Sequence, residues 1–267
     1  MKDRSLSAGA VRILETAGAT DKAQASRSLA TEWRAGRIAG IGSATPPARP
    51  ARPKHPELKA PRDVPRRTIS AGAKGRIALL HALAHIELNA IDLAWDILAR
   101  FADTGLPRAF CDDWVGVADD EARHFLMLAG RLADLGAAYG DLPAHDGLWQ
   151  SASGTAHDLL ARLAVVPMVL EARGLDVTPA MIGKLRAVSD TQSGAILQVI
   201  HDDEIGHVAV GRRWFQHVCA ERGLDPATTF QRLVREHFRG QVKPPFNRDS
   251  RDRAGFPAGY YEPLAAG

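Results

Sequence analysis

Two Glu-x-x-His pairs, each preceded by a lone glutamate in an apolar run, constrain this chain more than any other feature. The six residues concerned are Glu87, Glu121, His124, Glu171, Glu204 and His207. At positions i and i+3 of a helix, a carboxylate and an imidazole leave the same face, one above the other. A four-helix bundle that binds two metal ions in its core uses this set of ligands. The pattern therefore predicts an all-α fold built around a dinuclear metal site.

The spacing of these residues repeats once along the chain. Glu87 precedes Glu121 by 34 positions, Glu171 precedes Glu204 by 33, and the two Glu-x-x-His pairs are 83 positions apart. A single Glu-x-x-His is a weak signal, because helices are rich in glutamate. Two of them, in register with two more glutamates, indicate two helical hairpins related by a pseudo-twofold axis.

A solvated helix surface or a buried salt-bridge network is the alternative interpretation. The residues around Glu87 are apolar: Leu83, Ile86, Leu88 and Ile91. Burying four carboxylates without cations would be very costly. The apolar surroundings therefore favour the metal site over the network.

Length and composition set broad limits on the chain. Its 267 residues suit one large domain or two small ones. The cysteines, Cys111 and Cys219, are too few for a disulfide framework and indicate a reducing, cytoplasmic setting. We find no apolar stretch that we expect to span a membrane and no signal-peptide core at the N-terminus. A net charge of +3 permits an anionic partner without requiring one.

Three regions are expected: N-terminal helices with a Pro/Arg-rich segment (1–68), a ferritin-like bundle (69–240) and an irregular tail (241–267). Residues 5–37 read as two helical pieces, the second capped by Asp21. The later helices are expected at about 73–103, 107–135, 153–173, 178–188, 189–222 and 226–239. The tail contains aromatic residues whose burial could order it: Phe246, Phe256, Tyr260 and Tyr261.

Proline and glycine residues are expected to interrupt the third long helix. Pro167 removes a backbone hydrogen bond four residues before Glu171 and should kink or bulge the helix there. Gly174 is expected to end this helix, and Thr178 with Pro179 to open a short one.

Residues 46–56 are rich in proline and arginine and favour an extended, polyproline-like conformation. With Arg49, Arg52 and Lys54, this segment could contact nucleic acid or an acidic protein. The preferred interpretation is a strap laid across the surface of the bundle.

Four phrases carry a resemblance to a known family. They are LLHALAHIEL (79–88), ADDEARH (118–124), LEARGLDVTP (170–179) and DEIGHV (203–208). Together they resemble the bacterial family catalogued as domain of unknown function 455, a branch of the ferritin-like di-iron carboxylate superfamily. From about residue 20 to the tail, the resemblance implies a ferritin-like bundle and carries the six residues over as metal ligands. A more distant similarity is to the non-haem di-iron tRNA hydroxylases.

Carboxylate and imidazole ligands suit iron, manganese and zinc. With two irons, an O₂-dependent oxidase or hydroxylase is the first hypothesis. Its substrate would be a small molecule or RNA, and a ferredoxin or reductase would supply electrons. Peroxide or iron handling is the second hypothesis, and a metal-loaded structural or binding module the third. Monomer and dimer both stay open. Tyr139, Tyr260 and Tyr261 lie outside the expected bundle helices, which disfavours a radical-generating subunit unless the tail folds back.

Several neighbouring residues receive secondary roles. His81 and His85 are expected to face away from Glu87, because neither is three or four positions from it. His201 shares the face of Glu204 and is either an extra ligand, a proton carrier or a packed histidine. Asp120 and Asp203 each precede a ligand glutamate, and they either orient a ligand histidine or are solvated.

Overall fold

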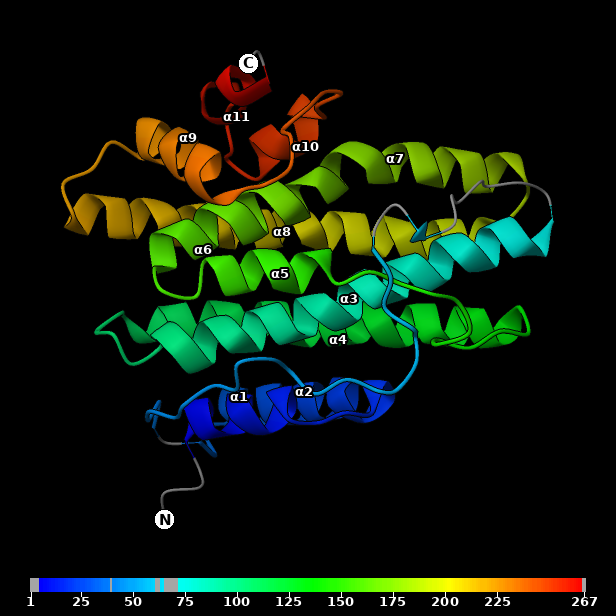
Figure 1. Ribbon diagram of the computed structural model, residues 1–267, viewed down its shortest axis with the longest axis horizontal. Helices are drawn as coiled ribbons and strands as arrows, with labels where there is room; N and C mark the ends of the chain where they lie inside the picture. The colour runs from blue at the N-terminus through cyan, green and yellow to red at the C-terminus, as the bar shows by residue number, and fades with distance from the viewer. Residues whose placement is uncertain (1–4, 39, 61–62, 65–71, 266–267) are drawn as a thin grey trace. The chain divides into compact units, whose positions relative to one another are not determined.

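The computed structural model describes residues 5–38, 40–60, 63–64 and 72–265 (Figure 1). Every named element in these residues is helical, and only isolated bridges join Ser5 to Gly40 and Leu58 to Ala144. The expected all-α class is therefore confirmed. The first four residues and the expected boundary at residues 68–69 lie outside the described ranges.

The chain forms two compact units, residues 1–149 and 150–267. Among the described residues, the α-helices that lie wholly in the first unit are α1 (Leu6–Leu14), α2 (Ala19–Arg34), α3 (Ala73–Phe101) and α4 (Arg108–Asp134). A short helix, α5 (Gly147–Gly154), contains the division between the units.

The first unit is built on a hairpin of α3 and α4, which run antiparallel along their lengths (Figure 1). Gly105, with φ +88°, lies in the short connection between them. The α1 helix packs on α3, and α2 packs on α4. Inside this arrangement the indole nitrogen of Trp95 donates to the hydroxyl of Ser26 at 2.8 Å. The N-cap of α2 is Gly18, so the prediction that Asp21 caps this helix is wrong: Asp21 lies in the first turn.

The Pro/Arg-rich segment is joined to the first unit by ion pairs that reach into the core. Arg52 pairs with the fully buried Asp92 at 2.8 Å, and the ammonium of Lys22 contacts the same carboxylate at 2.5 Å. Lys22 also donates to the carbonyl of Ala51 at 2.9 Å. Arg49 pairs with Asp146. These arginines hold the segment on its own unit.

In the second unit, the elements of residues 159–265 are all helical. They are α6 (Leu159–Val165), the π-helix η3 (Val166–Glu171), α7 (Ala172–Ala187), α8 (Thr191–Glu221), α9 (Pro226–His237), α10 (Arg248–Arg253) and α11 (Ala258–Ala265). The α7 and η3 elements pack against α8, and α6 packs against α8 and α9. The expected bulge at Pro167 is present as the whole of η3.

The predicted helix end at Gly174 and the predicted new helix at Thr178 are wrong, because α7 continues through both positions and through Pro179. Leu175, Ile182 and Leu185 are buried along this helix. Burial of that apolar stripe against α8 outweighs the local cost of a glycine and a proline.

The tail differs from the irregular chain that was expected, since it contains α10 and α11. Asn247 caps α10 by accepting from the backbone nitrogen of Ser250 at 3.2 Å. The expected burial is observed for Phe256, Tyr260 and Tyr261, which are nearly inaccessible and pack around Phe230 of α9 or one another, whereas Phe246 is only partly buried.

Contrary to our expectation from the sequence, α3 is long and apolar enough to cross a membrane by length and composition. Most of its apolar window is buried inside the protein, as in the core helix of a globular domain.

Candidate metal centre

The α3–α4 hairpin places Glu87 opposite the first Glu-x-x-His pair. Glu87 lies 14 positions before Phe101, the last residue of α3, and Glu121 lies 13 positions after Arg108, the first residue of α4. Residues at equal distance from the turn of an antiparallel hairpin stand at the same level. The sequence therefore brings these carboxylates together through local geometry alone.

Three predicted ligands form one buried group in the first unit. The Nδ1 atom of His124 lies 3.3 Å from Oε2 of Glu87 and 3.6 Å from Oε2 of Glu121. One ligand atom from each of the three lies within 4.8 Å of the others. Their exposed fractions are 0–3%. Because His124 faces both carboxylates, a single cation could contact all three side chains.

Burial and the neighbouring carboxylate raise the pKa of Glu87 well above its ordinary value. The hydrogen bond to His124 opposes this shift but does not cancel it. Because burial disfavours the ionised form of these carboxylates, a bound cation would stabilise their negative charge. Neighbouring ligand atoms of a tetrahedral zinc site lie about 1.6 times the roughly 2.0–2.2 Å bond length apart, which agrees with the 3.3 and 3.6 Å between Nδ1 of His124 and the two carboxylates. The three residues thus fit a metal by charge and by size.

The second unit contains the other three predicted ligands. Glu204 and His207 share one face of α8, with Nδ1 of His207 3.7 Å from Oε1 of Glu204. Glu171 is half-buried at the last residue of η3, and η3 packs on α8. A π-helix is commonly found at functional sites because it displaces side chains from regular α-helical register. Each unit therefore holds a lone glutamate next to a helix with a Glu-x-x-His pair.

His81 and His85 are buried and engaged with the 139–145 loop, in keeping with the expectation that they face away from Glu87. The backbone nitrogen of Gly140 donates to Nε2 of His81 at 2.9 Å. Nε2 of His85 lies 3.0 Å from the carbonyl oxygen of His145, which can only accept, so this nitrogen carries the proton.

The contact between Tyr139 and His85 was missed by the sequence analysis. The hydroxyl of Tyr139 lies 2.9 Å from Nδ1 of His85, and since the other ring nitrogen of His85 is a donor, the tyrosine donates. The tyrosine ring also stacks on His81 and meets the edge of Phe125, which follows His124. Burial lowers the pKa of His85 to about 4 and so keeps the imidazole neutral. Although outside the helices, this tyrosine thus packs against both α3 and α4.

His201 is a packed histidine whose Nε2 lies 3.1 Å from the hydroxyl of Ser250 in α10. This is the third of the roles considered for it. Asp120 contacts Arg123 at 3.1 Å one turn away. An orienting role for Asp120 or Asp203 toward a ligand histidine stays a prediction.

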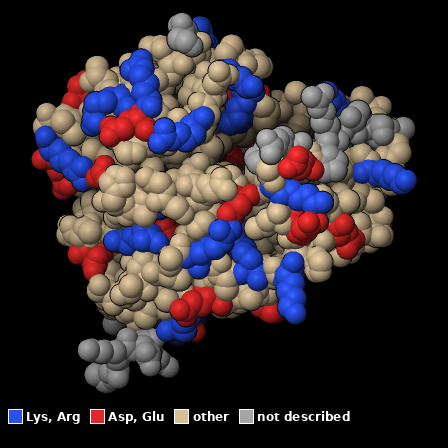
Figure 2. All heavy atoms as spheres, viewed as in Figure 1, with Lys and Arg blue, Asp and Glu red and all other residues tan. Residues whose placement is uncertain are grey.

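Surface charge gives little support to a nucleic-acid interface on the Pro/Arg-rich segment. Arg49 and Arg52 are engaged in the ion pairs of the first unit. On the face drawn in Figure 2, Lys and Arg side chains are interspersed with Asp and Glu. A broad, continuous basic surface, which is the usual footprint of nucleic-acid binding, is not seen on that face.

Comparisons with known proteins identify a family but do not supply a reaction. The family described as "Protein of unknown function (DUF455)" matches residues 15–262. An uncharacterized protein of Haemophilus influenzae is 44% identical over 209 residues, which is 76% of this chain and 72% of the relative. No solved structure matches the chain.

Proposed function

The chain belongs to the DUF455 family, and from this premise and its buried ligand residues we propose that it is a dinuclear metal carboxylate protein acting as an O₂-dependent oxidase or hydroxylase. The observation that carries the proposal is the buried group of Glu87, Glu121 and His124, whose ligand atoms lie within 4.8 Å of one another. Two buried carboxylates facing one imidazole are difficult to explain without a cation.

The second half of the proposed centre comes from the other unit. We propose that the two units close into one ferritin-like four-helix bundle, in which Glu171, Glu204 and His207 complete the ligand set. The repeated spacing of the two halves supports this arrangement, because it is what two equivalent hairpins require. Each half would then offer one imidazole and two carboxylates.

The ligand chemistry favours iron. Three ligands per half leave positions for a substrate, and a mixture of carboxylate and imidazole suits Fe(II) and Mn(II), and less selectively Zn(II). When two irons are bound, the centre supplies the two electrons with which O₂ is activated. An external electron donor and a small-molecule or RNA substrate would complete the reaction.

The protein's own residues would prepare the site before any substrate arrives. Glu87 and Glu121 provide negative charge in a place that water hardly reaches, since both are almost fully buried. His124 holds its Nδ1 toward both carboxylates. The π-helix that ends at Glu171 fixes the direction of that side chain through its packing on α8. Such preorganisation is how a metal site sets its geometry.

Metal content tests the proposal directly. We expect protein purified under low oxygen to bind about two irons per chain and to gain near-ultraviolet or visible absorption on exposure to air. Glu121→Ala and Glu204→Ala should each lose most of the metal, whereas Glu221→Ala, an exposed position on the same helix as Glu204, should retain it.

Other outcomes of these measurements would reject different parts of the proposal. Two zinc or manganese ions that do not respond to oxygen would reject oxidation and leave a structural or hydrolytic metal protein. Full metal retention in both Glu121→Ala and Glu204→Ala would reject the ligand assignment. A folded protein that binds no added metal would reject the centre itself.

A further inference from the structure

The second unit contains a cavity of about 210 Å³ that no part of the proposed metal chemistry requires. Its walls come from η3, α7, the segment before α10, and the helices α9, α10 and α11. Binding sites for drug-sized molecules are typically about 300–1,000 Å³. The cavity therefore suits a smaller ligand, with the bulk of a single aromatic ring or a short acyl chain.

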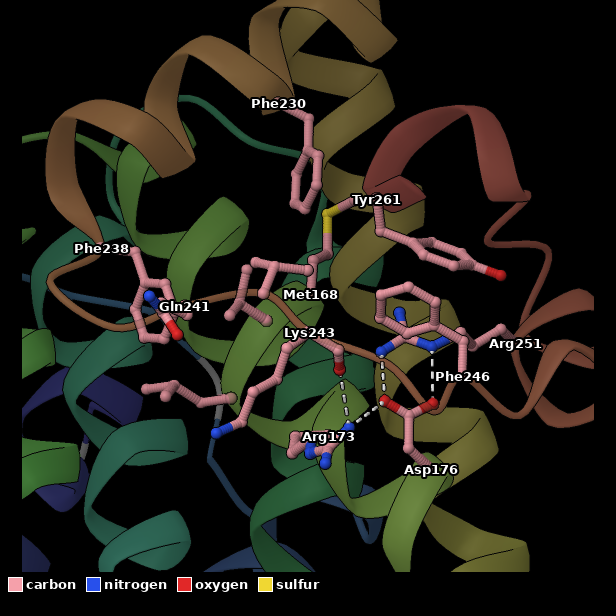
Figure 3. Close-up of a pocket in the computed structure, with 13 residues that line it drawn as sticks. Met168, Arg173, Asp176, Phe230, Phe238, Gln241, Lys243, Phe246, Arg251 and Tyr261 are labelled. Carbon is pink, nitrogen blue, oxygen red and sulfur yellow. Dashed lines mark hydrogen bonds and ion pairs between the residues drawn. The ribbon is translucent and has the colours of Figure 1, made fainter. Parts of the chain in front are cut away.

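Apolar side chains form most of this wall. Figure 3 shows the rings of Phe230 and Tyr261 toward one end and Met168 between them and the polar end. The rings of Phe246 and Tyr261 meet edge to face with centroids 4.7 Å apart. Met168 is almost fully buried, so its polarisable thioether is fixed in place against the cavity. Such a surface binds an apolar group by shape and dispersion.

The charged residues of the wall have an excess of positive charge. They are Arg173, Lys243 and Arg251 against the single carboxylate of Asp176, a net charge of +2. Asp176 accepts two hydrogen bonds of 2.8 Å from Arg251 and a longer one of 3.4 Å from Arg173, so one carboxylate is shared between two guanidinium groups. The wall consequently presents the charge of Arg173 and Lys243 to whatever enters.

Arg173 is held in place by its own contacts. One of its terminal nitrogens donates to the carbonyl oxygens of Lys243 and Pro245 at 3.0 and 3.1 Å and to Oδ2 of Asp176 at 3.4 Å. A guanidinium has five donors, so further donors of the same group are available to a ligand. In Figure 3 the side chains of Arg173 and Lys243 lie at the end of the view away from Phe230. The cavity is thus apolar at one end and cationic at the other.

We propose that this cavity binds a small organic carboxylic acid, with its ring or acyl chain against Met168, Phe230 and Tyr261 and its carboxylate at Arg173 and Lys243. Arginine and lysine bind carboxylates by charge-assisted hydrogen bonds. Small-molecule sites share this combination of an apolar wall and a few convergent polar groups.

The position of the cavity connects it to the metal centre. Met168, Val169 and Leu170 all line the cavity, and they directly precede Glu171 on η3. A bound acid would therefore rest on the same π-helical turn that carries a proposed metal ligand. Its role as a substrate rests on the proposed function, whereas its binding does not.

Binding can be measured by isothermal titration calorimetry with phenylacetate and hexanoate, on metal-free and on iron-loaded protein. We expect saturable binding of at least one acid, and at least about tenfold weaker binding of the neutral analogue phenylacetamide, because the amide lacks the charge. Inorganic phosphate alone should bind negligibly, because it cannot use the apolar wall. Equal affinity for acid and amide, or no saturable binding by either acid, would overturn the proposal.

Variants of the cavity wall test whether the acid binds in this cavity. Lys243→Gln should weaken acid binding by about threefold to tenfold, and Val242→Trp should abolish it by filling the cavity. Lys184→Gln, an exposed lysine on α7 outside the cavity, is the matched control and should leave affinity unchanged. Unchanged affinity in both Lys243→Gln and Val242→Trp, with folding retained, would place binding elsewhere. Acid binding by a protein that cannot be loaded with metal would reject the proposed function alone, and metal binding without acid binding would reject this cavity alone.

Discussion

The ring of Pro167 in η3 packs directly against the backbone of Gly211 in α8. A Cβ atom added at Gly211 would lie 2.4 Å from Cβ and 2.5 Å from Cγ of the proline. The glycine therefore permits the close approach of the π-helix to α8. Since Gly211 lies one turn after His207, and Pro167 one turn before Glu171, this contact fixes the spacing between two predicted ligand-bearing elements.

Substituting Gly211→Ala should lower stability. The new methyl group would overlap a rigid ring that cannot move without shifting η3, and overpacking of this kind typically costs about 1–3 kcal/mol. Chemical denaturation followed by circular dichroism would give the change in the free energy of unfolding.

Gly206→Ala is the matched control for that experiment. It lies on the same helix, and a Cβ atom there would meet nothing within 4 Å. Alanine is favoured over glycine in a helix by roughly 1 kcal/mol, so this variant should be as stable as wild type or more stable. Equal effects of the two substitutions would contradict the role given to the Pro167 contact.

The buried ion pair between Arg251 and Asp176 should stabilise the docking of α10 on α7. Both side chains are at most 4% exposed, and the guanidinium of Arg251 lies 4.2 Å from the ring centroid of Tyr261. Replacing Arg251→Met leaves a buried carboxylate without its main cation, and removal of one partner from such a pair costs roughly 3–5 kcal/mol. Thermal and chemical denaturation would measure the loss.

Arg248→Met on the same short helix supplies the comparison. Arg248 pairs with Glu262 at the surface, where its side chain is 67% exposed, so its loss should cost less than about 1 kcal/mol. A double-mutant cycle of Arg251→Met with Asp176→Asn would separate the pair from the aromatic contacts of Arg251. If the coupling between them were near zero, the ion pair would not be what secures the tail.

The two cysteines should be unreactive in the folded protein. Cys111 and Cys219 are both free and buried, and burial raises the pKa of each thiol to about 11. Because the thiolate is the reactive form, an aromatic disulfide reagent at pH 8 should label neither thiol in native protein. In denaturant it should label two per chain, and rapid labelling of either thiol in native protein would show that the packing around it opens.

The α3–α4 hairpin and the shared face of each Glu-x-x-His pair could be predicted from the sequence because local geometry determines them. Helical spacing places Glu121 and His124 on one face, and the short turn sets Glu87 opposite. Contacts made by loops and tail could not be read in this way. Tyr139 meets His85 only because the loop after α4 folds back, and nothing in the local sequence encodes that return.

The α7 helix is a second case that the local sequence does not predict correctly. Gly174 and Pro179 are local signals for a helix end, yet the helix continues because its apolar stripe is buried. Asp176, which periodicity alone would treat as an ordinary polar residue, is buried because Arg251 comes from 75 positions away to neutralise it. Propensity is a weak guide wherever tertiary contacts of this kind compete with it.

The pH dependence of stability should include a contribution from His201. Burial is the largest cause that lowers its pKa in the folded protein; Asp202 opposes the shift and Arg253 adds to it. Arg186 and Asp249 line the same hollow. The unfolded chain therefore binds a proton at higher pH than the folded protein does. By linkage, the stabilising contribution is complete above the ordinary histidine pKa of about 6.5 and is lost as pH falls below it.

Replacing His201→Gln removes this titration while retaining a polar side chain near Ser250. The free energy of unfolding at pH 7.5, 6.5 and 5.5 should fall less steeply for this variant than for the wild type. His217→Gln, a half-exposed position on the same helix, should retain the wild-type dependence. If His201→Gln were to keep the full loss of stability between pH 6.5 and 5.5, then the sensitivity to acid would arise from other groups, and burial of the His201 imidazole would not govern it.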